Sequence, residues 1–165
     1  MKCWYLIQTK SRQERLAQEN LERQGYMTYL PFAEIRRRRR GKTIRVVDPM
    51  FPRYLFIHLS DETDDWRPIR STIGVSTLVR FGQIPARVPD SLISTLRNRE
   101  NEQGIQIIDT PDFQTGQNIR IAEGPMEGYE GIFQSKTGKE RVTVLLQIAE
   151  KSISIQLASD QIEPL

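Results

Sequence analysis

The sequence contains very little cysteine and histidine, with one residue of each among 165. A single cysteine excludes a disulfide within the chain, and Cys3 with His58 cannot supply the three or four ligands of a zinc site. Long hydrophobic runs are also lacking, since none approaches the roughly 18 to 20 residues of a membrane helix, and the apolar stretch near the N-terminus is too short for a signal peptide. We therefore expect a cytoplasmic protein without a metal, a cofactor or a membrane contact.

The sequence offers little for catalysis. Cys3 and His58 are the only thiol and imidazole, and both lie on expected strands, where packing roles are common. The acidic cluster at residues 61–65 is typical of a solvated loop. The glycine-rich stretch 116–131 lacks the Gly-Lys-Ser/Thr ending of a phosphate-binding loop. The sequence therefore predicts that the protein is not an enzyme.

Charge divides the chain into two unlike parts. Residues 1–100 contain 19 Lys and Arg against 11 Asp and Glu, whereas residues 101–165 contain 5 against 10. A basic part is attracted to phosphate by counterion release, and an acidic part is repelled from it. Between them, residues 99–115 lack a sustained hydrophobic period, so we expect a linker there, with domains at 1–98 and 116–165.

The first domain mixes strands and helices without regular βαβ alternation, which indicates an α+β sandwich with an antiparallel sheet. Strands are expected at residues 4–9, 26–32, 35–40, 44–47, 54–59 and 76–81. A capping box, Ser11-Arg-Gln-Glu14, predicts a helix start, and Gly25 predicts its end. The side chains expected to face inward are Leu16, Ala17 and Leu21 on this helix, and Leu92, Ile93 and Leu96 on a second helix at 90–99.

Alternating apolar residues in the second domain indicate short antiparallel strands and a small barrel. Between 142 and 157 the pattern is double, because Val142, Leu145, Ala149 and Ile153 also recur at helical spacing. The β-branched residues in this stretch favour strand. The helical alternative stays open.

Two features of the first domain suggest partners. Five consecutive arginines at residues 36–40 suit contact with phosphate, or else form a solvated hairpin tip. On the expected strand 54–59, Tyr54, Phe56 and His58 share one face, while apolar residues occupy the other. Either helices cover both faces of a central strand, or the aromatic face is a docking surface for a partner.

Several motifs together resemble a known family. They are Trp4-Tyr5, Phe51-Pro-Arg-Tyr-Leu-Phe56, Gly74-Val75, Val79-Arg-Phe-Gly82, Val88-Pro89 and Gly124-Pro125 followed by Gly128 and Gly131. In this order and spacing they resemble the NusG family of transcription elongation factors over nearly the whole chain. Within the family, the specialised paralogue RfaH is most similar in Leu21-Glu-Arg-Gln24, Asp48-Pro-Met-Phe-Pro52 and Ser76-Thr-Leu-Val-Arg-Phe-Gly82.

The resemblance implies an NGN-type domain at 1–98 that binds RNA polymerase, a linker at 99–115, and a KOW domain at 116–165 with an SH3-like barrel. Tyr54 and Phe56, with Phe51 beside them, match the apolar pocket for the polymerase clamp helices. The positions that match contacts to the non-template DNA strand of the transcription bubble are Lys10, Gln13, Asn20, Arg23, Gln24, Arg40 and Thr72.

The implied function is transcription elongation and antitermination by a monomeric factor that suppresses pausing and termination. Its KOW domain would contact the small ribosomal subunit, coupling transcription to translation, or the termination factor Rho. RfaH-like proteins can also fold the C-terminal segment as a helical hairpin that masks the polymerase site. Asp48 and Arg141 match an interdomain ion pair of that state, so autoinhibition is a hypothesis here.

Two other functions compete with this one. The first is an RNA-binding or ribosome-associated KOW protein, although the acidic C-terminal half argues against direct nucleic-acid binding there. The second is an enzyme that depends on Cys3, whose activity Cys3→Ser would abolish.

Overall fold

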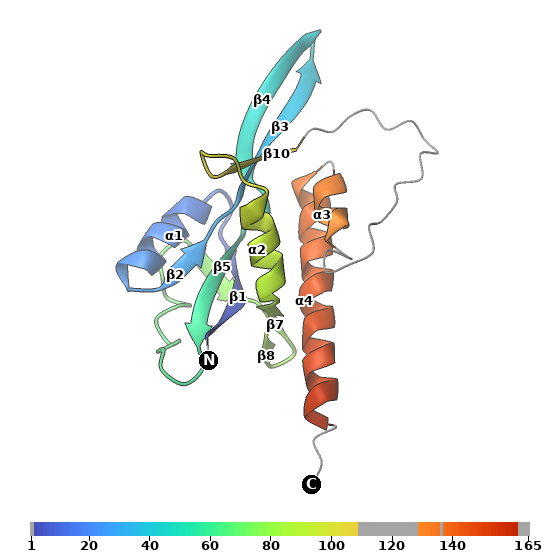
Figure 1. Ribbon diagram of the computed structural model, residues 1–165. Coiled ribbons are helices and arrows are strands. Elements are labelled where there is room, and N and C mark those ends of the chain that lie inside the picture. Colours follow the sequence, from blue (N-terminus) through green and yellow to red (C-terminus); the bar gives the residue numbers. More distant parts are fainter. Residues whose placement is uncertain (1, 109–128, 136, 162–165) are drawn as a thin grey trace.

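The computed structural model describes residues 2–108, 129–135 and 137–161 (Figure 1). In chain order the elements are β1 (Lys2–Thr9), α1 (Glu14–Arg23), β2 (Met27–Tyr29), β3 (Phe32–Arg39), β4 (Lys42–Pro49), β5 (Tyr54–Ser60), β6 (Val75–Leu78), β7 (Arg80–Phe81), β8 (Ile84–Pro85), β9 (Arg87–Val88), α2 (Asp90–Asn98), β10 (Ile105–Ile108), α3 (Glu130–Gln134) and α4 (Gly138–Gln161). Helices and mainly antiparallel sheets alternate irregularly, so the expected α+β class is confirmed. The glycine turn at 124–128 and the apolar pair at 119 and 121 lie outside the described residues.

The main sheet has the order β2-β5-β1-β6, and β9 also pairs with β1. Its centre is the antiparallel pair of β1 and β5, which runs from Lys2 opposite Ser60 to Gln8 opposite Tyr54. Helix α1 covers one face, where Ala17 and Leu21 pack with Leu55, Ile57 and Leu59 of β5. On the other face α2 packs against Leu6 and Phe56 through Leu92, Ile93 and Leu96. The central strand is therefore buried on both faces, and the inward residues expected on α2 are confirmed.

The second sheet is a long hairpin of β3 and β4, which extends away from the main sheet (Figure 1). Strand β10 pairs with β3 in parallel, from Ile105 opposite Phe32 to Ile108 opposite Ile35. A turn at Asn101 leads into β10. The Asn101 side-chain oxygen stabilises this turn, because it accepts hydrogen bonds from the backbone N–H groups of Gln103 at 2.9 Å and Ile105 at 3.1 Å. The first part of the expected linker is therefore packed against the hairpin.

The expected start of α1 is wrong in its details. The chain turns between Lys10 and Gln13, with Arg12 in the left-handed region at φ 62°, so Ser11 lies outside the helix and caps nothing. The Glu14 carboxylate instead accepts the backbone N–H of Arg53 at 3.1 Å. Ala17 and Leu21 are buried as expected, but Leu16 is 41% exposed. The turn rotates the helix so that its buried stripe passes through Ala17 and not Leu16.

The strands expected between residues 142 and 157 are also wrong, because this stretch lies within α4. Leu145, Ala149 and Ile153 recur every four residues and form a buried stripe. Leu145 and Ala149, together with Ile132 of α3, pack into the same cluster as Phe51 and Phe56. Burial of this stripe outweighs the strand preference of the β-branched residues, since intrinsic propensity yields to tertiary context.

No helix in the described part of the chain is long and apolar enough to cross a membrane.

The Asn101 turn predicts a measurable contribution of residues 101–108 to stability. Asn101→Ala leaves two backbone N–H groups without their acceptor, so the free energy of unfolding should fall by about 1–2 kcal/mol. Urea unfolding of the full chain measures this. Asn98→Ala is the matched control, because Asn98 is exposed at the last residue of α2, and it should change stability by less than about 0.5 kcal/mol. Equal losses in the two variants would contradict a structural role for the turn.

Candidate functional site

Three aromatic residues expected to bind a partner lie together on one face of the main sheet; we call Phe51, Tyr54 and Phe56 the aromatic face. The rings of Phe51 and Phe56 meet edge to face, with centroids 5.8 Å apart, and Tyr29 stacks on Phe56 at 6.0 Å. Phe51 is 1% exposed and Phe56 is fully buried, while Tyr54 is half-buried beside them. Residues of β2, of β5 and of the turn before β5 thus form one continuous apolar surface.

Helices α3 and α4 cover the aromatic face. Tyr129, Ile132, Leu145 and Ala149 belong to its cluster of buried residues. Two further contacts join α3 and the residue before it to α2 and the residue after it. The hydroxyl groups of Ser91 and Tyr129 are 2.7 Å apart, and the Arg99 guanidinium lies 3.7 Å from the centre of the Phe133 ring. The surface expected to face a partner is therefore sealed by the chain's own C-terminal segment in this structure.

Arg141 anchors the start of α4 to the N-terminal part. Its side chain is 1% exposed, and Nε donates a hydrogen bond to the backbone oxygen of Met50 at 2.7 Å, while Nη1 donates to that of Ser135 at 3.3 Å. A buried guanidinium requires such acceptors, because an unpaired buried charge is very costly. The sequence pointed to Arg141 but not to these partners. A backbone carbonyl belongs to every residue, so no residue type marks it as the acceptor.

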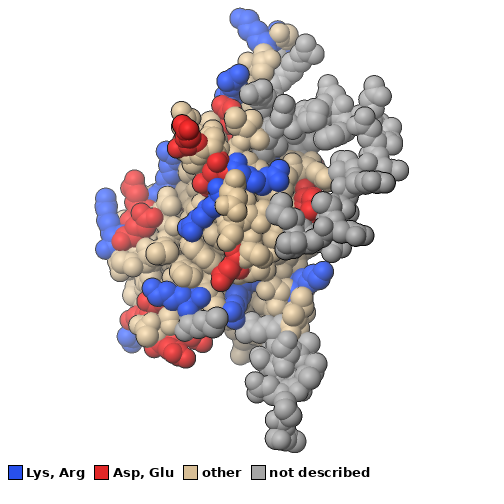
Figure 2. All heavy atoms as spheres, viewed as in Figure 1, with Lys and Arg blue, Asp and Glu red and all other residues tan. Residues whose placement is uncertain are grey.

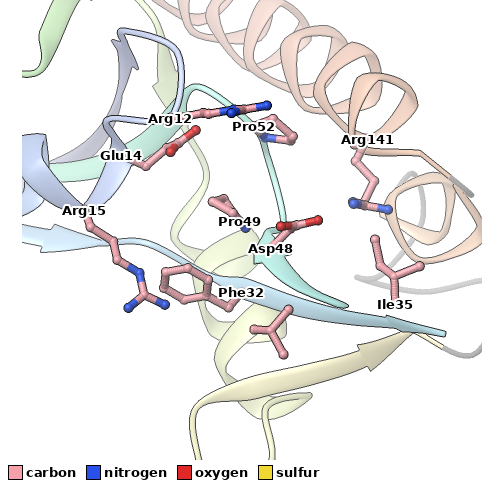
Figure 3. Close-up of a pocket in the computed structure, with 11 residues that line it drawn as sticks. Arg12, Glu14, Arg15, Phe32, Ile35, Asp48, Pro49, Pro52 and Arg141 are labelled. Carbon is pink, nitrogen blue, oxygen red and sulfur yellow. The ribbon is translucent and has the colours of Figure 1, made fainter. Parts of the chain in front are cut away.

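Asp48, the expected partner of Arg141, lines a cavity of about 600 Å³ that Arg141 also lines. In Figure 3 its carboxylate points toward the side from which Arg141 enters. Gly138 also lines this cavity, and a Cβ added to it would lie 2.5 Å from Cγ of Pro52. The first turn of α4 can therefore approach the segment after β4 only because residue 138 has no side chain.

Several residues expected to contact nucleic acid lie on α1 or at its ends. Asn20 is on the helix, while Gln13 and Gln24 are the residues just before and just after it. The Gln24 amide donates hydrogen bonds to Thr72 Oγ1 at 2.8 Å and to the Asn20 backbone oxygen at 3.0 Å. The Asn20 amide donates to the backbone oxygens of Leu16 at 3.0 Å and Ile73 at 3.3 Å. We call Asn20, Gln24 and Thr72 the amide patch.

The amide patch is preorganised. Thr72 is only 6% exposed, and its hydroxyl donates to the Pro68 backbone oxygen at 2.9 Å while it accepts from Gln24. Thr72 therefore positions Gln24 and presents little surface of its own. The side-chain oxygens of Asn20 and Gln24 take part in none of these bonds, so they can accept from the amino groups of bases.

The basic residues expected to contact nucleic acid lie in two separate places. Lys10 lies beside the amide patch, because its backbone N–H donates to Gly74 O at 2.9 Å, and Arg23 is exposed in the last turn of α1. Arg40 lies at the tip of the β3–β4 hairpin, far along it from α1 (Figure 1). Figure 2 shows basic side chains toward this tip and over the body, interspersed with acidic ones.

The sequence analysis did not single out Ile73, which lies beside the amide patch. Its side chain is 68% exposed, although its backbone oxygen is bound by Asn20. The sequence feature that could have indicated its exposure is an isoleucine between Thr72 and Gly74 in a polar turn.

Cys3 and His58 do not form a thiol–imidazole pair. Cys3 is opposite Leu59 and packs with the residues beneath α1, whereas His58 is opposite Trp4 and stacks on its ring at 4.6 Å. Successive residues of a strand point to opposite faces, so the thiol and the imidazole are separated by the sheet. Burial, and then a hydrogen bond to Glu100, raises the pKa of Tyr29, which stacks on Phe56.

Comparisons with known proteins show which family this chain belongs to. Residues 2–97 match the family model NusG, described as "Transcription termination factor nusG". Proteins named "Transcription termination/antitermination protein NusG" from Staphylococcus aureus strains Mu50 and N315 are each 27% identical, over 99% of this chain and 96% of their own length. A solved structure titled "Domain interaction in Thermotoga maritima NusG" is similar with a TM-score of 0.44 and 21% identity, covering 77% of this chain and 76% of that one. Because the family model spans more than half of the sequence, the chain belongs to the NusG family.

Gly74 fixes the distance between α1 and the turn that completes the amide patch. It has φ +94°, and a Cβ there would lie 2.8 Å from the backbone nitrogen of Ala17, whereas Gly25 has φ +92° with nothing within 4 Å. Gly25→Ala should therefore cost only the left-handed strain of roughly 1–2 kcal/mol. Gly74→Ala should cost a further 1–3 kcal/mol, approximately, because α1 must move. Thermal or urea unfolding compares the two, and equal losses would contradict a close packing of α1 on this turn.

Proposed function

We propose that this protein is a transcription elongation and antitermination factor that binds RNA polymerase through the aromatic face. The observation that carries the proposal is the aromatic face itself, since Phe51, Tyr54 and Phe56 form an apolar surface that α3 and α4 cover. Membership of the NusG family supports a transcriptional role and polymerase as the partner. Contiguous apolar surfaces rich in aromatic residues are typical of protein interfaces.

The structure corresponds to a closed state of the RfaH type in this proposal. Polymerase and the C-terminal helices compete for one surface, so the factor must open before it binds. Opening exposes Phe51 and Phe56, and each ring costs roughly 2–3 kcal/mol when it returns to water. A partner that buries the rings again offsets this cost, which couples polymerase binding to release of α3 and α4.

The amide patch is proposed to contact the non-template DNA strand of the transcription bubble. Amide groups can form two hydrogen bonds with a base edge, and Lys10 and Arg23 supply charge for the phosphates. Arg40, at the hairpin tip, is proposed to reach the backbone farther along the strand. Unpaired bases suit such a site, because their edges are free of base-pairing partners.

The C-terminal segment is proposed to become a KOW-type barrel after release. Its β-branched residues between 142 and 157 suit strands once the stripe of Leu145, Ala149 and Ile153 loses its packing partners. In that form it would contact the ribosome or Rho. Opening, polymerase binding and refolding would all take place in the cytoplasm.

Arg141→Met tests the closed state. The variant leaves the Met50 and Ser135 oxygens without their donor, at a cost of about 1–3 kcal/mol for each buried group. Opening should then become at least about tenfold more frequent, because 1.4 kcal/mol corresponds to a factor of ten. We expect tighter binding to core RNA polymerase, measured by biolayer interferometry, together with lower helix content by circular dichroism.

Lys139→Met is the matched control, since Lys139 is exposed two residues away in the same turn of α4, and it should bind polymerase like the unmodified chain. If Arg141→Met loses helix and still binds no better, the closed state does not mask the polymerase site. Retention by ribosomes alone, with polymerase ignored by every variant, would favour a ribosome-associated protein instead.

Asn20→Ala and Gln24→Ala test the amide patch. Each removes amide contacts worth about 1–3 kcal/mol per base, so binding to an elongation complex should weaken about fivefold or more and lose sequence preference. Fluorescence anisotropy with complexes that differ in the non-template strand measures both effects. Gln18→Ala, on another side of α1, is the control and should have no effect. A loss that is the same for all strand sequences would mean that the patch contacts only the DNA backbone.

A further inference from the structure

The cavity between the two parts of the chain has the size of a ligand site. Its volume is about 600 Å³, within the range of roughly 300–1,000 Å³ that is common for small-molecule pockets. The turn before α1, the base of the β3–β4 hairpin and the first turn of α4 line it, and it is open to solvent on one side. Figure 3 shows Arg12 and Arg141 on two of its sides, with Arg15 beside Phe32.

The charges in the cavity favour an anion. Three guanidinium groups line it against two carboxylates, those of Glu14 and Asp48. Glu14 already accepts a hydrogen bond from the Arg53 backbone N–H. Among the described residues, neither Arg12 nor Arg15 forms an ion pair with a carboxylate, and both side chains are exposed. Guanidinium groups bind phosphate oxygens with two parallel hydrogen bonds, which suits a phosphorylated ligand.

The backbone at Arg12 and the side chain of Arg15 are fixed by local contacts. Arg12 has φ 62°, a left-handed conformation that is uncommon for a residue with a side chain and that the Lys10–Gln13 turn imposes on its backbone. The Arg15 guanidinium lies over the Phe32 ring, 4.6 Å from its centroid, which limits its freedom. A site whose cationic groups are ordered in advance loses less entropy when a ligand binds.

The remaining walls are apolar. Phe32, Val47, Pro49 and Pro52 line the cavity beside the arginines, and Val47 is exposed. A ligand with phosphate groups and a flat ring therefore matches the lining better than an inorganic ion alone. A nucleoside polyphosphate has this combination of groups and an appropriate size.

We infer that this cavity binds a small phosphorylated ligand of nucleotide size, which bridges the N-terminal part and α4. Arg12, Arg15 and Asp48 come from the first part, whereas Gly138 and Arg141 come from α4, so the complete site exists only in the closed arrangement. A ligand that binds this arrangement alone raises its population by the factor 1 + [L]/Kd. The ligand would therefore oppose opening, a consequence that rests on the closed state proposed above.

Isothermal titration calorimetry on the full chain, at fixed ionic strength, tests the site with sodium triphosphate, ATP, GTP and adenosine as probes. We expect the nucleotides to bind, triphosphate to bind more weakly, and adenosine not to bind. Arg12→Gln and Arg15→Gln should each weaken binding by about tenfold, as expected for loss of one strong charged contact. Arg80→Gln removes an exposed arginine that does not line the cavity and should leave affinity unchanged. An absence of binding, or an equal loss in Arg80→Gln, would overturn the site.

Hydrogen–deuterium exchange on the protein alone tests the bridging. ATP should slow the exchange of α4 amides in the unmodified chain and not in Arg15→Gln. Binding without any protection of α4 would overturn the bridging role. Neither experiment contains polymerase, so a negative result here leaves the Arg141→Met comparison intact, and failure of that comparison leaves the binding measurement intact.

Discussion

Burial of two phenylalanine rings is the interaction on which this structure depends. Phe56 lies on β5 of the main sheet and Phe51 in the turn before it, and α3 and α4 cover them with Ile132, Leu145 and Ala149. Without that cover, the N-terminal part would expose a continuous apolar surface, which soluble proteins rarely leave in contact with water. In the described part of the chain, polar contacts of Arg141, Ser91 and Arg99 help to attach the cover. The cover keeps the rings dry, and a partner proposed to bind the same face would have to displace it.

The helical form of the C-terminal segment is a consequence of this burial. Residues 142–157 combine a helical stripe with many β-branched side chains, so local preference and tertiary contact favour different structures. The stripe that packs on the aromatic face decides between them here, because it contributes more than the small differences in propensity. A segment balanced in this way responds to the loss of its packing surface, and the helices and the barrel would then be alternative structures of one sequence.

The sequence predicted the elements with a strong local pattern and missed those fixed by distant contacts. β1 and β5 were predictable because each is a short, nearly continuous apolar run, and α2 because Leu92, Ile93 and Leu96 recur at helical spacing and face inward. β10 was not, since its partner β3 lies far away in the sequence and its four residues are too few to show a clear period. The Ser11 cap failed because the left-handed turn at Arg12 moves the helix start to Glu14. Among the candidate site residues, the sequence could name Arg141 and Gln24 but not their partners.

Helix α1 connects the two proposed interfaces. Asn20 and Gln24 are on the stripe that meets the 72–74 turn, while Arg15 leans over Phe32 on the side of the hairpin and the cavity. Gly74 packs directly on the backbone of Ala17, so the helix cannot shift along the sheet without breaking that contact. The proposed DNA contacts and the proposed ligand site therefore share one element. Arg12, in the turn that leads into α1, and Arg141, on α4, line the same cavity, so the position of α1 sets part of the space beside the first turn of α4.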